Sequence, residues 1–249
     1  MARETKVADV LEWSRSLARL REETRCNSPG FFKPYHFVTL ALLLKEQKAG
    51  IVNLPPEVTN YAARMRLWDA IGLPTPVAVP PSPSGSRFHP LSALIDLDAV
   101  DAVSNALTEV ILQNVGKPCS NETRDSLFIT LTELLGNCHH HARSEDGLHG
   151  LVCAQTWYQD ARAQFAIADS GIGIRKSLAE SPDLTKRLDS ENACTLATKL
   201  GVSSKLNRGH AGYGLAVARD LALQTPGAML MVQSLNEMFI VQDGKYEEI

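Results

Sequence analysis

Three short motifs constrain this chain more than any other feature, because they follow one another in a fixed order. ELLGNCHHHA runs from Glu133 to Ala142, ADSGIGI from Ala168 to Ile174, and GHAGYGLAV from Gly209 to Val217. The first has helical spacing, and the other two are glycine turns beside a predicted strand and a predicted helix. Each could occur alone by chance, but in this order they predict one pocket built from three segments.

The first motif predicts a helix from Glu122 to His141 with two different faces. Apolar residues at helical spacing form a predicted core-facing stripe, namely Leu127, Leu131, Leu134, Cys138 and Ala142. Glu133, Asn137 and His141 are each four residues apart and form a polar stripe beside it. A carboxylate next to an amide can activate a water and, together with phosphate oxygens, hold Mg²⁺. Taken alone, the same pattern fits a solvated helix face.

The second motif follows a predicted strand, Gln164 to Ala168, and opens with Asp169. An ionised carboxylate only accepts hydrogen bonds, so Asp169 suits the exocyclic amine of adenine. Gly171 and Gly173 permit positive φ and allow the backbone to approach a flat base. An ordinary hairpin turn is the alternative explanation.

The third motif places Gly212 and Gly214 before a predicted helix, Leu215 to Leu223. Backbone N–H groups at a helix N-terminus form an anion site suited to phosphates. A glycine-rich helix entry without a ligand is the alternative. The three motifs together make ATP the leading ligand.

These motifs resemble the N box and the two glycine boxes of the GHKL superfamily, which includes gyrase-type topoisomerases, ninety-kilodalton heat-shock chaperones, histidine kinases and anti-sigma-factor kinases. The resemblance covers about Leu127 to Val241. It implies an α+β fold, the Bergerat sandwich, with a helical layer on a mixed, mainly antiparallel sheet. It also implies that residues 175–210 form a mobile lid over ATP.

By motif position, the resemblance assigns Glu133 as general base and Asn137 as Mg²⁺ ligand. The other implied ATP-binding residues are Asp169, Gly171, Gly173, Lys205, Gly209, Gly212, Gly214 and Leu215. Two departures limit the carry-over. No histidine occurs from Asp96 to Asn121, so we do not expect autophosphorylation of the histidine-kinase type, and Met238 stands where many members have a threonine beside the adenine.

Pro and Ser concentrate between Pro74 and Pro90, which indicates a linker. We therefore expect a small α/β unit over 1–75, a linker over 76–92 and an ATP-binding domain over 93–249. The small unit has two predicted helices, a short strand at Ile51 to Leu54 and a third helix at Glu57 to Ile71. This order resembles STAS-like modules.

The consecutive histidines His139, His140 and His141 point about 100° apart on a helix, so we do not expect them to converge on one metal ion. The net charge of −3 offers no basic surface for nucleic acid, and five irregularly spaced cysteines indicate reduced thiols. Without an apolar span, we expect a cytoplasmic protein with no membrane contact.

We expect a slow Mg²⁺-dependent ATPase that acts as a nucleotide-dependent switch on a protein partner, in bacterial signalling or defence. A serine/threonine kinase of the anti-sigma-factor type and a non-catalytic ATP sensor stay open as alternatives. Homodimerisation also stays open.

Overall fold

The computed structural model describes residues 4–23, 28–78, 87–113, 119–141, 148–203 and 212–249. The first part of the chain forms four helices: α1 (Val7–Glu23), α2 (Pro34–Glu46), α3 (Pro56–Arg64) and α4 (Leu67–Ile71). The central part forms β1 (Phe88–Leu94), α5 (Leu97–Leu112), α6 (Asn121–His141), β2 (Gly150–Trp157) and β3 (Arg162–Ala168). A single turn of 3₁₀-helix, Tyr158–Asp160, joins β2 to β3.

The last part begins with three short helices, α7 (Ile174–Leu178), α8 (Pro182–Leu188) and α9 (Ala193–Ala197). The chain continues with α10 (Gly214–Gln224), β4 (Met229–Ser234), β5 (Glu237–Gln242) and β6 (Lys245–Glu248). Six strands form two three-stranded sheets, ordered β1-β2-β3 and β4-β5-β6. Every strand pair in the described residues is antiparallel, so the expected α+β class is correct, and the mixed sheet is replaced by two antiparallel ones.

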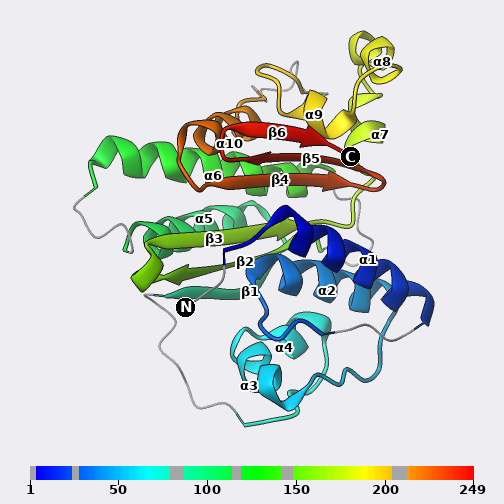
Figure 1. Cartoon of the computed structure of the whole chain (residues 1–249), viewed down its shortest axis with the longest axis vertical. Coiled ribbons are helices and arrows are strands. Elements are labelled where there is room, and N and C mark those ends of the chain that lie inside the picture. The colour runs from blue at the N-terminus through cyan, green and yellow to red at the C-terminus, as the bar shows by residue number, and fades with distance from the viewer. Residues whose placement is uncertain (1–3, 24–27, 79–86, 114–118, 142–147, 204–211) are drawn as a thin grey trace.

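Strand β2 explains how the first sheet is covered on both faces. Leu151 and Cys153 belong to a core shared with α1 and α2, whereas Val152 and Ala154 belong to a core shared with α5 and α6. Successive side chains of a strand point to opposite faces, so a strand buried on both sides reads as an unbroken apolar run. Figure 1 shows α1 and α2 on the near side of the strands and α5 and α6 behind them.

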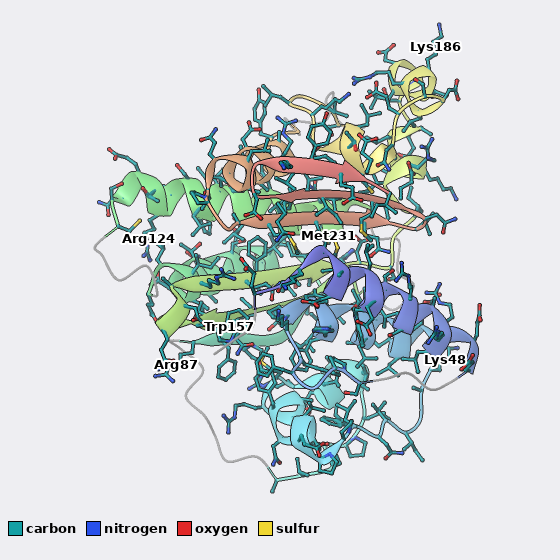
Figure 2. The ribbon with its side chains drawn as sticks, viewed as in Figure 1. Lys48, Arg87, Arg124, Trp157, Lys186 and Met231 are labelled. Carbon is teal, nitrogen blue, oxygen red and sulfur yellow. The ribbon has the colours of Figure 1, made fainter. Side chains whose placement is uncertain are left out.

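The N-terminal helices therefore pack on the β1-β2-β3 sheet, most of which belongs to the predicted nucleotide domain. Phe37 and Val38 of α2 are almost fully buried in the core that includes Leu151. Met229 and Met231 of β4 pack against this core as well, and Figure 2 labels Met231 where β4 faces the N-terminal helices. The division into units over 1–75 and 93–249 stays a prediction.

Several sequence predictions of elements are wrong, and each error has a physical reason. Ile51 to Leu54 is not a strand, because it lies between two helices with no partner strand beside it. The described N-terminal residues up to 78 are helical with no strand, so the expected α/β composition and the STAS-like resemblance are not confirmed. The predicted helix from Glu57 to Ile71 is broken at Arg66, which adopts positive φ. Strand β1 occupies the end of the predicted linker over 76–92.

In the described residues, no helix is both long and apolar enough to cross a membrane. Cys119, Cys138, Cys153 and Cys194 are free thiols, as predicted.

Candidate functional site

Helix α6 carries the first motif and lies between the core and solvent. Leu131, Leu135 and Cys138 are buried against the first sheet, whereas Glu133 is half-buried and Asn137 is exposed. The predicted core stripe is wrong at Leu134, since Leu135 is the fully buried residue and Leu134 is only half-buried. Leu134 lies three residues after Leu131 and Leu135 lies four residues after it, so both continue the stripe at helical spacing and only tertiary packing decides which is buried.

Glu133 packs against the glycine that begins α10. A Cβ added at Gly214 would lie 3.0 Å from the Cβ of Glu133 and 3.1 Å from its Oε2. Only glycine lets the two helices approach this closely without displacing the carboxylate. The first turn of a helix has N–H groups without intrahelical partners, so the fold brings an acid next to the N-terminal backbone donors of α10.

Asp169 lies directly after β3, at the C-terminal half of α6. Its carboxylate Oδ1 accepts a hydrogen bond from the Gly171 N–H at 2.7 Å. Burial raises the pKa of Asp169, and this hydrogen bond partly opposes the effect. The side chain is nevertheless exposed to solvent. Asp169 is therefore surrounded by protein atoms on one side and remains accessible to solvent on the other.

Cys138 shows that Asp169 and α6 are neighbours. The pKa of the Cys138 thiol is raised chiefly by burial and also by the negative charge of Asp169. A Cβ at Gly150 would lie 3.1 Å from both the Cys138 Cβ and the Ala168 carbonyl oxygen, so α6, β2 and β3 meet tightly here. The first and second motifs are thereby brought to one place.

The glycine turn after Asp169 is attached to the β4–β5 hairpin. Gly173 has a φ of 83° and is followed by Ile174, whose N–H donates to the Ser234 Oγ at 2.8 Å. Gly171 is not among the glycines with positive φ, so the predicted conformational role applies to Gly173 alone. Sequence reasoning missed Ser234, because a serine beside a hairpin turn is ordinary turn chemistry.

Gly212 follows the segment over 204–211, which lies outside the described residues. Its φ is 65°, and an added Cβ would lie 2.8 Å from the Val202 carbonyl oxygen. Gly212, on one side of this segment, is therefore in close contact with Val202, near the other side. Lys205 and Gly209 fall within that segment and stay predictions. Leu215 is half-buried and packs against the core of the second sheet.

Residues 174–203 cover the described part of the lid that the sequence predicted for 175–210, and the mobility of that lid stays a prediction. They form α7, α8 and α9 around a small core of their own, made by Leu178, Leu184, Leu188, Ala193 and Leu196. The labelled Lys186 marks the outer end of this helical segment, away from the strands (Figure 2). A polar sequence concealed this core because the helices are short and each contributes only one or two buried side chains to it.

The histidine run is only partly described. The rings of His139 and His149 are in contact at a tilt of 56°, with centroids 4.3 Å apart, which places His139 against the start of β2. The side chains of His140 and His141 lie outside the described residues. Over the described part of the chain, no three His, Cys, Asp or Glu residues form a group able to hold a metal ion.

The oxygen donors on α6 do fit an ion that is largely held by phosphates. Mg²⁺ takes oxygen ligands and keeps several waters, so it needs only one or two protein oxygens beside a triphosphate. The exposed amide of Asn137 can supply one, and the half-buried carboxylate of Glu133 lies one turn away on the same face.

The model of the histidine kinase-like ATPase domain matches residues 94–225, which span α5, α6, the first sheet's β2 and β3, the helical segment and α10. No curated protein and no solved structure matches the chain. Since the matched region is more than half of the chain and contains all three motifs, the protein belongs to the histidine kinase-like ATPase domain family.

Proposed function

We propose that this chain binds ATP between α6 and the N-terminus of α10, hydrolyses it slowly and uses the bound nucleotide to signal to a protein partner. The observation that carries this proposal is the contact between Glu133 and Gly214. It places an acid beside the N-terminal N–H groups of α10, where a terminal phosphate and an attacking water would both be held.

Asp169 provides the adenine end of the proposed site. A carboxylate that already accepts the Gly171 N–H retains further lone pairs for an amine of the base. The turn that follows is fixed by Gly173 and Ser234, so the base would meet a preorganised surface. Preorganisation matters because ordering a loop on binding would cost affinity.

Glu133 and Asn137 divide the phosphate chemistry between them. Glu133 orients the attacking water and accepts a proton from it. Asn137 would bind Mg²⁺ through its side-chain oxygen. Bound Mg²⁺ would neutralise negative charge on the phosphates. The N–H groups of the first turn of α10 hold the same phosphates through hydrogen bonds and the helix dipole.

The nucleotide-dependent switch would act through Gly212. This residue joins the proposed phosphate site at Gly214 to Val202, the last part of the helical segment before 204–211. A ligand that stabilises one arrangement of this connection shifts its population, and the surface offered to a partner changes with it.

The test is incubation of the purified chain with Mg²⁺ and γ-labelled ATP, beside a Glu133→Ala variant whose ATP binding has been measured. We expect phosphate release that Glu133→Ala abolishes while it still binds ATP. Transfer of label to an added protein would identify a kinase instead. Binding without release or transfer would refute hydrolysis and leave the sensor as the function.

A further inference from the structure

The turn that follows Asp169 continues directly into α7, and α7 carries the most connected charged residue of the helical segment. Arg175 donates from Nε and Nη2 to the two carboxylate oxygens of Glu237, at 2.8 and 2.7 Å. Its Nη1 donates to the Leu188 carbonyl oxygen at 2.6 Å, and Nη2 also donates to the Glu191 carbonyl oxygen at 3.1 Å. One guanidinium thus joins α7, the end of α8 and the first residue of β5.

Glu237 extends the same connection to α9. Its Oε1 accepts the Ala193 N–H at 2.7 Å, and Ala193 is the first residue of α9. The Arg175 guanidinium lowers the pKa of Glu237, and the Ala193 N–H adds to this effect. Glu237 therefore stays ionised near neutral pH, so the pair remains intact under ordinary conditions.

We propose that Arg175 and Glu237 form a clamp that positions the Asp169–Gly173 turn for nucleotide, so that the helical segment controls nucleotide affinity without touching it. Ile174 and Arg175 attach consecutive residues of the chain to the β4–β5 hairpin, through Ser234 and Glu237. When the clamp is lost, the end of the turn is held by the Ile174–Ser234 hydrogen bond and by the packing of the Ile174 side chain, and the charged connection through Glu237 is missing. The binding-competent fraction then falls, and the apparent dissociation constant rises by the reciprocal of that fraction.

The expected effect is modest. The Arg175 side chain is 45% exposed and that of Glu237 is 21% exposed, so water and salt screen the charges. Bidentate geometry and the two bonds to carbonyl oxygens strengthen the connection. We expect Arg175→Ala to weaken nucleotide binding by about three- to tenfold, with a faster dissociation rate and little change in global stability.

This inference rests on the proposed ATP site, and its test separates the two. Arg175→Ala, Arg175→Lys and Glu237→Ala are compared with Arg21→Ala, which removes an exposed ion pair to Glu46 between α1 and α2. Amide hydrogen exchange over 174–203 is measured without nucleotide, and affinity is measured with ATP that carries a fluorophore on its ribose. Urea unfolding shows that each variant is folded.

We expect faster exchange and weaker binding for Arg175→Ala and Glu237→Ala, an intermediate effect for Arg175→Lys, and neither change for Arg21→Ala. Faster exchange with unchanged affinity would overturn the proposal, because the clamp would then stabilise only its own segment. Unchanged exchange and unchanged affinity would overturn it as well. Wild-type protein that fails to bind labelled ATP would refute the proposed function, and this inference with it, whatever the exchange data show.

Discussion

Gly212→Ala is the substitution whose cost follows most directly from the structure. The new Cβ would lie 2.8 Å from the Val202 carbonyl oxygen and 3.0 Å from the Val202 carbonyl carbon, which are backbone atoms. Forcing such a contact costs about 1–3 kcal/mol. The φ of 65° adds the cost of a left-handed conformation for a residue with a Cβ, about 1–2 kcal/mol. Together, these two costs should destabilise the native contact between Val202 and Gly212 by about 2–5 kcal/mol.

Gly201→Ala is the matched control. Gly201 has a φ of 72° in the same part of the chain, but an added Cβ would meet nothing within 4 Å. Gly201→Ala should therefore destabilise the native conformation only by the cost of the left-handed backbone, about 1–2 kcal/mol. Both variants are assayed by hydrogen exchange at residues 199–203 and by ATP affinity. Equal effects for the two variants would refute the reasoning, because the close backbone contact would then contribute nothing.

Three further predictions test other parts of the structure. Gly136→Ala should stabilise the protein by about 0.5–1 kcal/mol in urea unfolding, because the position is inside α6 and has open space around it; destabilisation would mean that this space is needed. Phe37→Ala should cost about 3–5 kcal/mol, because Phe37 is fully buried in the core shared with the first sheet; a loss under 1 kcal/mol would show that this core is dispensable. The Glu237 pKa is lowered in the folded state, so its contribution to stability is present above the ordinary pKa of 4.5 and is lost as pH falls through the folded value. Protection of the amides over 174–203, with each rate divided by the intrinsic exchange rate at the same pH, should therefore decrease at acid pH in the wild type and depend less on pH in Glu237→Gln; identical pH dependence of protection would contradict this cause.

The sequence predicted α6, β2, β3 and α10 well, because each carries a clear period and a clear boundary. Leu151 to Ala154 form an apolar run in a central strand, and Gly214 begins the last long helix. The same reasoning was wrong at Leu134, because a small rotation of α6 decides which neighbouring leucine is buried.

The parts that the sequence did not predict depend on distant contacts. Strand β1 begins beside a proline-rich stretch and contains Pro90, and its pairing with β2 is what makes it a strand. The Arg175–Glu237 pair joins residues 62 positions apart, and neither residue type predicts its partner. Ser234 likewise gains its role only when the hairpin folds against Ile174. Such contacts are properties of the tertiary structure and have no local pattern.

The site could be predicted further than the fold around it. Glu133 and the glycine Gly214 were assigned to one pocket from motif order, and the structure places them in contact. The catalytic and nucleotide-binding roles of the motif residues stay predictions until they are measured.

Calorimetric titration of the purified chain with ATP and with GTP, in the presence of Mg²⁺ and beside Asp169→Ala, shows whether Asp169 selects adenine. An ionised Asp169 accepts a hydrogen bond from the amine of adenine, whereas guanine presents a carbonyl oxygen at the corresponding position. The account predicts that the wild type binds ATP, prefers it to GTP, and loses this preference in Asp169→Ala. Equal binding of both nucleotides, or ATP binding that Asp169→Ala leaves unchanged, would contradict it.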